Sequence, residues 1–221
     1  SAASDVYKRQ VLNRKAQESE KMKQAFINSI CHEIRTPLNS IVGFSDLIMN
    51  EDIDEEMRRE FPAEIQKSTL LLTRLVNSML EVANLDVSED KLPCEPVDIR
   101  NMCMQEMEKI SPKPRIKYQL DITEDTLFIP TNAQYLTMVI EHLLNNANKF
   151  TEEGFIALGY KVNLSKNQIC ISVTDSGCGI PKEKQEEVFN RFSKLDTFVP
   201  GNGLGLYLCR LIVKRLDGEI K

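Results

Sequence analysis

The stretch NSICHEIRTPLNSIVGFSDLI, residues 28–48, carries apolar residues at intervals of three and four positions, interrupted by a histidine and a proline. That spacing predicts one face of an amphipathic helix. The stripe consists of Ile30, Ile34, Leu38, Ile41, Ser45 and Ile48, and Phe26 continues it upstream. We therefore expect one long helix over residues 11–50.

A second helical stripe follows the acidic segment NEDIDEE at 50–56, in which Asp54 is suited to cap the helix N-terminus. Its members are Phe61, Ile65, Thr69, Leu72, Leu75, Val76, Met79 and Val82. The two helices should form an antiparallel hairpin. Leu70, Leu71 and Leu80 widen the apolar face beyond what one partner helix covers, so we expect two hairpins to pair as a dimeric four-helix bundle. The alternative is that the excess apolar surface packs on the C-terminal domain.

The composition is that of a globular protein without a dominant charge. Of the 221 residues, 42% are hydrophobic and 28% are charged, and the formal net charge is −5. No basic field indicates nucleic acid as a partner, and no apolar run approaches the roughly 18 residues of a membrane helix. We predict a cytoplasmic portion with no nucleic-acid partner and no membrane contact. Whether a longer parent protein is anchored in a membrane stays open.

The cysteines and the N-terminal segment give two further expectations. The cysteines include no CxxC pair, which favours a reduced interior over a disulfide framework or a zinc site. We expect each of the six to be a small buried residue: Cys31, Cys94, Cys103, Cys170, Cys178 and Cys209. The segment SAASDVYKRQ, residues 1–10, resembles translated adapter sequence, so we exclude it from fold prediction and expect a linker helix over 11–24.

The composition changes after Leu85, where DVSEDKLPCEP is polar and contains proline, as linkers often do. Strand and helix patterns alternate beyond it. We expect strands near 96–99, 116–122, 126–129, 155–162 and 168–174, with helices ending near 107, over 133–150, near 184–192 and over 204–216. This order predicts a mixed α/β sandwich with helices on one side of a sheet, so the fold class is α plus α/β.

His32 lies on the exposed side of the first predicted helix. At about 100° per residue, it is about 200° from Ile30 and therefore opposite the apolar stripe. Thr36 shares that exposed face, and Glu33 lies on its flank. A histidine in such a place is more often an ordinary surface residue, but Pro37 follows it inside the helical pattern at a cost of roughly 3 kcal/mol. A zinc site of the HExxH type is excluded, because Thr36 occupies the second histidine position.

The string HEIRTPLNSI, residues 32–41, closely resembles the phospho-acceptor box of the sensor histidine kinases of two-component systems. The resemblance implies that His32 is the nucleophile that takes the γ-phosphoryl group of ATP. It also implies that Glu33 orients the imidazole or accepts its proton, and that Thr36 positions water for a phosphatase reaction. A neutral imidazole has a nitrogen lone pair for such a role. Since neighbouring residues do not face each other on a helix, Glu33 has to reach round it.

The segment HLLNNANKFT, residues 142–151, resembles the N box of the same family. By that match Asn146 binds Mg²⁺, Lys149 contacts the phosphates and Asn145 is an additional helper. One amide oxygen together with ATP phosphates suits the octahedral oxygen shell of Mg²⁺. The first box position, usually asparagine, is His142 here, and both a phosphate or water contact and a structural role stay open for it.

Three more segments resemble the remaining boxes of the nucleotide site. VTDSGCGIP at 173–181 resembles the G1 box, so Asp175 would accept a hydrogen bond from the exocyclic amine of adenine, with Gly177 and Gly179 close to the base. VFNRF at 188–192 resembles the F box, whose Phe189 and Phe192 would anchor a lid. GNGLGL at 201–206 resembles the G2 box. Its glycines would bind the triphosphate through backbone amides, with a lid cation nearby: Gly201, Gly203, Gly205 and Lys194, or Arg191 in place of Lys194.

The resemblance covers residues 25–220. It implies a dimerisation and phospho-acceptor domain over 25–88 and an ATP-binding domain of the GHKL (Bergerat) fold over 89–221. The closing strands and third glycine box are missing after LDGEIK, so we expect this domain to be truncated.

The implied activity is ATP-dependent phosphorylation of the chain's own His32, followed by transfer to an aspartate of a response-regulator receiver domain. ATP and Mg²⁺ are the implied cofactors, and a homodimer is the implied assembly. One alternative is a catalytically impaired nucleotide-binding scaffold, for which His142 and the missing glycine box argue. A second is a GHKL ATPase without phospho-transfer, of the gyrase and MutL type, against which the HEIRTP box argues.

Overall fold

The computed structural model describes residues 2–50, 54–87, 92–123, 125–191, 193 and 203–221. The chain divides into two compact units, residues 1–80 and 81–221. The first unit is a helical hairpin, and the second combines helices with two small sheets.

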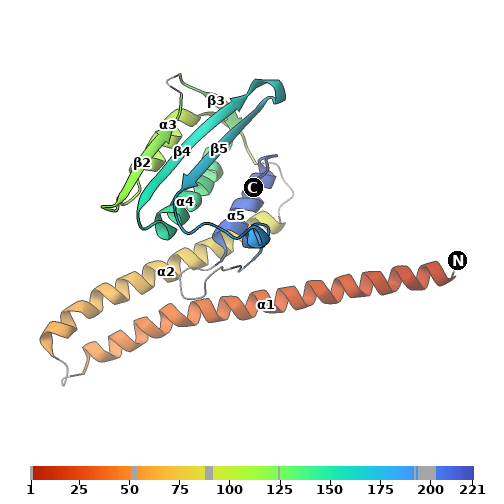
Figure 1. Cartoon of the computed structure of the whole chain (residues 1–221). Coiled ribbons are helices and arrows are strands. Elements are labelled where there is room, and N and C mark those ends of the chain that lie inside the picture. The colour runs from red at the N-terminus through yellow and green to blue at the C-terminus, as the bar shows by residue number, and fades with distance from the viewer. Residues whose placement is uncertain (1, 51–53, 88–91, 124, 192, 194–202) are drawn as a thin grey trace. The chain divides into compact units, whose positions relative to one another are not determined.

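The hairpin consists of α1 (Ala2–Ile48) and α2 (Glu55–Val87), which run antiparallel (Figure 1). The Asp54 carboxylate accepts a hydrogen bond from the amide of Glu56 at 3.4 Å, so it caps α2 as predicted. A guanidinium nitrogen of Arg58 donates to the Asn50 carbonyl at 2.8 Å. The rings of Phe44 and Phe61 pack with their centroids 5.5 Å apart. The helix α1 begins further upstream than expected and includes residues 2–10.

The packed stripe of α1 differs in part from the predicted one. It runs through the buried Pro37 and the half-buried Ile30, Ile34, Ile41, Phe44 and Ile48, with alternating steps of four and three residues. Leu38 is 45% exposed and Ser45 is also exposed, so their assignment to this stripe was wrong. The alternating spacing is the one that keeps a helix seam facing an antiparallel neighbour, and it selects Pro37 and Phe44 instead.

The α2 stripe is largely confirmed, and so is its surplus of apolar surface. Phe61, Leu75 and Val82 are buried. Thr69 and Val76 are exposed, contrary to the prediction, because their angle on the helix is outside the seam. Further exposed apolar residues of α2 are Leu70 (53%), Leu71 (43%) and Leu80 (57%).

The second unit contains two sheets rather than the single sheet expected. The strands β1 (Glu95–Asp98) and β3 (Phe128–Thr131) form an antiparallel pair. The larger sheet has the order β2 (Ile116–Asp121), β4 (Gly154–Asn163), β5 (Gln168–Asp175). Here β2 is parallel to β4, and β4 is antiparallel to β5. The turn between β4 and β5 includes the short helix η1 (Leu164–Lys166).

The helices of the second unit are α3 (Ile99–Glu108), α4 (Ala133–Phe150) and α5 (Gly205–Arg215). The side chain of Asp98 caps α3, and that of Asn132 caps α4 by accepting from the Tyr135 amide at 3.0 Å. In the described part of the helix predicted at 184–192, residues 184–191, no α-helix forms, and two 3₁₀ turns occur in this region instead: η2 (Lys182–Lys184) and η3 (Glu187–Phe189). Pro181 starts this segment, and its apolar residues are too few to sustain a helical stripe.

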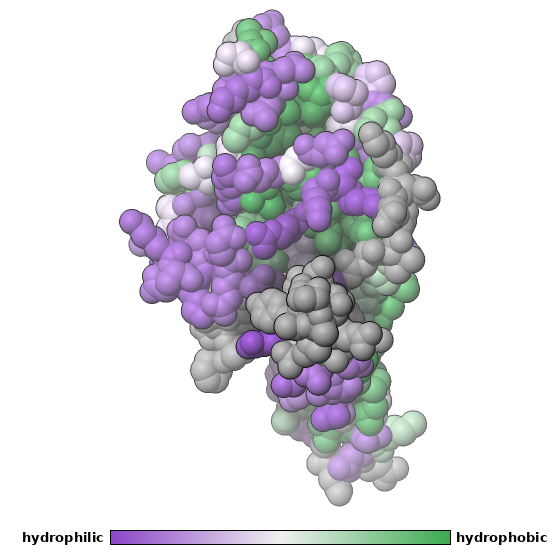
Figure 2. All heavy atoms as spheres, turned by 90° about the vertical axis from the view of Figure 1, so that its right-hand side faces the viewer, coloured by the Kyte–Doolittle hydropathy of each residue, from purple (hydrophilic) through white to green (hydrophobic). Residues whose placement is uncertain are grey.

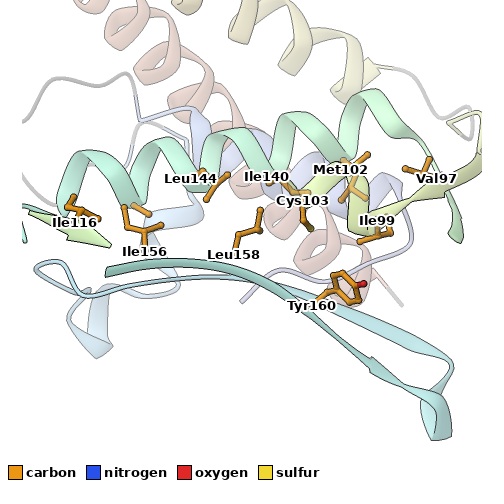
Figure 3. Packing of buried hydrophobic residues seen from close by; sticks show 12 residues of the cluster. Val97, Ile99, Met102, Cys103, Ile116, Ile140, Leu144, Ile156, Leu158 and Tyr160 are labelled. Carbon is orange, nitrogen blue, oxygen red and sulfur yellow. The ribbon is translucent and has the colours of Figure 1, made fainter. Parts of the chain in front are cut away.

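The helix α4 contributes to two hydrophobic clusters. Figure 3 shows the first, in which side chains from α3 and α4 meet those of the larger sheet. Its α4 members are Leu136, Ile140, Leu144 and Ala147. In the second cluster, Val139 of α4 packs with α5 and with the last turns of α2; the other buried members are Val82, Leu85, Leu208, Cys209 and Ile212. The predicted arrangement of helices on one side of a sheet is therefore confirmed.

The cysteines only partly follow the prediction. All six are free thiols, but only Cys103 and Cys209 are buried. Burial raises the pKa of the Cys103 thiol to about 11 and that of Cys209 to about 12. Cys31, Cys94, Cys170 and Cys178 are exposed because each lies on the solvent side of its helix, strand or turn, so their predicted burial was wrong.

Figure 2 shows hydrophilic residues over much of the face that it presents, with hydrophobic residues between them. Among the described residues, no helix combines the length and the apolar character that a membrane crossing requires.

The position of Leu158 at the centre of the first cluster gives a stability prediction. Its side chain is fully buried, so Leu158→Ala should lower the free energy of unfolding by about 3 kcal/mol through lost contacts and a cavity. Urea denaturation followed by circular dichroism measures this value. Leu164→Ala removes the same atoms from a side chain that is 88% exposed and should cost less than about 0.5 kcal/mol. Equal losses in the two variants would contradict this core assignment.

Candidate functional site

The phospho-acceptor segment lies within α1. His32 and Thr36 are both exposed, as the helix angles predicted, and Glu33 is half-buried. The Thr36 hydroxyl donates to the His32 carbonyl at 3.3 Å. Pro37 is buried and has no amide hydrogen, so the helix lacks one backbone bond a turn after His32. The imidazole therefore projects from a solvent-facing strip of a helix whose opposite side is packed.

The N-box residues lie on the second half of α4. Asn146 is half-buried, while Asn145 and Lys149 are exposed. The Lys149 ammonium lies 4.7 Å from the centroid of the Phe150 ring. Asn146 follows Val139 by seven residues, so it lies on the side of α4 that carries the second cluster, two turns nearer the C-terminus.

His142 packs against the start of α5. A Cβ atom placed on Gly205, the first residue of that helix, would lie 3.4 Å from His142 Nδ1. The imidazole therefore lies close to the backbone of Gly205. Burial lowers the pKa of His142 from its ordinary value, and the nearby Glu141 carboxylate opposes this effect. The half-buried imidazole is thus neutral at pH 7.

The turn after β5 is held in a defined conformation. Asp175 Oδ1 accepts a hydrogen bond from the Gly177 amide at 2.8 Å, and the Asp175 side chain is exposed. A Cβ atom on Gly177 would lie 2.5 Å from the Phe150 carbonyl oxygen, so only glycine permits this approach. Ser176 ties the turn to the start of β4, because its Oγ accepts from the Phe155 amide at 2.9 Å. One carboxylate oxygen of Asp175 is thereby fixed, and the other is available to an external donor.

The F-box segment is attached to α5. Phe189 is buried, as expected for an anchor. Arg210 of α5 lies with its guanidinium 5.3 Å from the Phe189 ring centroid and 3.0 Å from a Glu186 carboxylate oxygen. The Arg191 guanidinium lies 4.7 Å from the centroid of the Tyr207 ring. Both arginines therefore connect the F box to the helix that follows the G2 box.

The remaining predicted glycines and lid residues have separate outcomes. Gly179 and Gly203 have φ angles of 69° and 61°, which favour glycine. Gly201, Lys194 and Phe192 lie outside the described residues. A hollow of about 410 Å³ lies between η3 and the end of α5, with Phe189 and Arg210 in its wall. Its wall includes none of the predicted nucleotide-binding residues, so we do not assign it to the nucleotide.

Two domain families match the chain. Residues 22–87 match the His Kinase A (phospho-acceptor) domain, and residues 131–221 match the histidine kinase-, DNA gyrase B- and HSP90-like ATPase domain. His32 lies in the first match and Asp175 in the second. The chain belongs to the sensor histidine kinases.

Individual histidine kinases resemble most of this chain. It is 30% identical over 223 residues to the uncharacterized sensor-like histidine kinase ycf26 of Pyropia yezoensis, a match that covers 92% of the chain and 34% of that protein. It is 29% identical over 224 residues to the hybrid signal transduction histidine kinase A of Dictyostelium discoideum, covering 92% of the chain and 10% of that protein. The chain therefore spans well under half the length of either relative.

A solved histidine kinase has the same fold. Full-length ShkA, crystallised in complex with AMPPNP, superposes with a TM-score of 0.64 at 28% identity, over 88% of this chain and 41% of that one. The predicted fold, a helical hairpin followed by a GHKL-type α/β domain, is confirmed.

Sequence analysis missed a set of polar residues at the end of the kinase's N-box helix. Hydrogen bonds join Asn148 of α4 to Lys113 and Tyr118. Lys113 lies before β2 and Tyr118 lies within it, and β3 separates β2 from α4 in the sequence. The only signal in the sequence was Asn148, a third asparagine in NNANKF that the box assignment left without a role. Lys113 and Tyr118 had no signal, because their partners are distant in sequence.

The lowered pKa of His142 gives a pH prediction. An unfolded chain takes up the proton near the ordinary value of 6.5, whereas the folded chain does so only at lower pH, so acidification through this range favours unfolding. His142→Asn removes this contribution. Between about pH 7.5 and 5.5, its melting temperature should therefore fall less than that of the wild type. Differential scanning fluorimetry with exposed His32→Asn as the control measures the difference, and an unchanged pH response in His142→Asn would refute the assignment.

Proposed function

We propose that this chain is the core of an ATP-dependent protein histidine kinase that phosphorylates its own His32. The observation that carries the proposal is the exposed His32, one turn before a buried proline, within the phospho-acceptor match. The same chain supplies an ATPase-type domain with an accessible carboxylate at its G1 turn. The phospho-acceptor match favours this function over an ATPase without phospho-transfer.

In this proposal Asp175 selects adenine. One of its oxygens is occupied by the Gly177 amide, so the second accepts from the exocyclic amine, a donor that guanine lacks at that position. Gly177 and Gly179 bring the backbone close to the base. The glycines of the G2 box, Gly201, Gly203 and Gly205, bind the phosphates through backbone amides, with Lys149 and Lys194 as cations.

Mg²⁺ fits the donors present if the nucleotide supplies most of its ligands. The described residues contain no group of three or more His, Cys, Asp or Glu side chains that could hold a metal. Asn146 provides a half-buried amide oxygen, and one such hard donor with phosphate oxygens and water meets the needs of Mg²⁺. When bound, the ion would supply positive charge that offsets the charge of the phosphates.

The reaction needs one nucleophile and one proton acceptor. A lone pair on a ring nitrogen of His32 forms the N–P bond to the γ-phosphorus, and the bond from that phosphorus to the bridging oxygen breaks to release ADP. The proton on the other ring nitrogen passes to the Glu33 carboxylate or to solvent. Glu33 lies beside His32 on the helix flank and is half-buried, which suits a residue that orients the ring.

We further propose that the phosphoryl group passes from His32 to an aspartate of a response-regulator receiver domain in the cytoplasm. Exposure of His32 is what access by a second protein requires. Thr36 shares the exposed strip, where its hydroxyl could position water for the phosphatase reaction.

The proposed assembly is a homodimer formed through the hairpin. Leu70, Leu71 and Leu80 of α2 are exposed together with Leu38 and Val42 of α1. Because these side chains are about half exposed, each would gain about 1 kcal/mol on complete burial. A second copy of the hairpin covers them in a four-helix bundle.

Substitution of His32 and Asp175 tests the kinase assignment. His32→Gln should abolish incorporation of label from γ-labelled ATP while leaving ATP affinity unchanged, because only the acceptor nitrogen is lost. Asp175→Asn should weaken ATP binding by about tenfold or more, since the carboxylate acceptor is replaced by an amide. Label retention on a filter and isothermal titration calorimetry provide the two measurements. Label uptake by His32→Gln would exclude His32 as the acceptor.

Substitution of Leu80 tests the dimer. In a symmetric dimer each Leu80→Glu change counts twice, so the dissociation constant should rise by about a hundredfold or more. Light scattering coupled to size exclusion measures the mass across a dilution series. Leu164→Glu, in an 88% exposed position of the second unit, is the matched control and should leave the dimer intact. A monomeric wild type, or a Leu80→Glu chain that stays dimeric, would be evidence against this interface.

A further inference from the structure

A polar cluster joins the C-terminal end of α4 to the loop before β2. The Lys113 ammonium donates to the carbonyl oxygens of Asn148 and, at 3.0 Å, of Thr151. The Tyr118 hydroxyl donates to Asn148 Oδ1 at 2.7 Å and accepts from the Lys113 amide at 3.1 Å. The Asn148 side-chain amide donates to the Ser111 carbonyl at 3.3 Å. We refer to Lys113, Tyr118 and Asn148 as the Lys113 cluster.

The cluster supplies what the end of α4 lacks. The last carbonyls of a helix have no partner within it, and a cation near them is favoured by the helix dipole. The Lys113 ammonium meets both needs. The Thr151 hydroxyl does not contribute, since it is buried and has no hydrogen-bond partner. Within the described chain, the side-chain hydrogen bonds that hold this helix end come from the Lys113 cluster.

The two carbonyls bound by Lys113 flank Phe150, whose own carbonyl faces the G1 turn. A Cβ atom on Gly177 would lie 2.5 Å from the Phe150 oxygen, so the backbones of the helix end and the turn are in close contact. The Gly177 amide in turn donates to Asp175 Oδ1 at 2.8 Å. A continuous path of contacts therefore runs from Lys113 through the end of α4 to the Asp175 carboxylate.

We propose that the Lys113 cluster positions Asp175 for the amine of adenine, and so contributes to the choice of nucleotide without touching it. A shift of the Phe150 carbonyl would move Gly177, and with it the hydrogen bond that fixes one oxygen of Asp175. The whole carboxylate would then turn, so the hydrogen bond from the adenine amine to the second oxygen of Asp175 would be weakened most. This inference rests on the proposed adenine-binding role of Asp175.

The test compares two nucleotides on the full chain. ATP carries the exocyclic amine, and purine riboside triphosphate lacks it while keeping the ring, ribose and phosphates. Lys113→Met should weaken ATP binding by about fivefold and binding of the purine analogue by less than about twofold, because only ATP uses the positioned oxygen. Lys117→Met removes the same charge from an exposed lysine four residues away and should leave both affinities unchanged. Isothermal titration calorimetry measures all the values.

The outcomes separate the cluster from the adenine role itself. If the wild type binds both nucleotides equally, the role of Asp175 is wrong, and the inference falls with it. If the wild type prefers ATP but Lys113→Met loses affinity for both nucleotides equally, or for neither, the positioning role alone is wrong. Circular dichroism checks that each variant is folded. Tyr118→Phe, which removes a single hydroxyl, should give the same ATP-selective loss and decides the question if Lys113→Met does not fold.

Discussion

The packing of α4 between two hydrophobic clusters is the constraint on which the rest of the catalytic unit depends. Ile140 and Leu144 are buried toward the larger sheet, and Val139 is buried against α5. Each such side chain contributes about 1.5–3 kcal/mol on burial. A helix held on two sides cannot rotate about its axis without exposing one of them. The direction of Asn146, which lies on the same side of α4 as Val139 and two turns further on, follows from that restriction.

The second constraint is a backbone approach that leaves no room for side chains. Gly177 faces the Phe150 carbonyl, and Gly154, with a φ angle of 111°, lies against the Ser176 hydroxyl. These contacts bring the end of the N-box helix and the G1 turn together. The turn therefore gains its geometry from α4 as much as from its own sequence. Asp175 can remain exposed and still have a defined orientation, since its supports are packed.

The sequence predicted well those features that depend on local pattern. Hydrophobic periodicity predicted the helices α1, α2, α4 and α5 and the strands β4 and β5. The chemistry of Asp54 predicted its capping role. The prediction of a helix at 184–192 was wrong, because the sequence of a short segment does not distinguish an α-helical turn from 3₁₀ turns. Leu38 and Pro37 lie on adjacent stripes of α1, and the sequence of α1 alone does not show which stripe packs against α2. Within the Lys113 cluster, Asn148 is 30 or more positions from Tyr118 and Lys113, so no local pattern could indicate these contacts.

The residues of α2 take part in two separate sets of buried contacts, one on each side of the unit boundary at residues 80 and 81. Phe61 and Leu75 are buried in its hairpin portion, whereas Val82 and Leu85 pack with α4 and α5. At the same end, the Tyr135 hydroxyl of α4 donates to a Glu81 carboxylate oxygen at 3.4 Å, and burial together with Glu81 raises the Tyr135 pKa. The last turns of α2 are therefore part of the packing that supports α4.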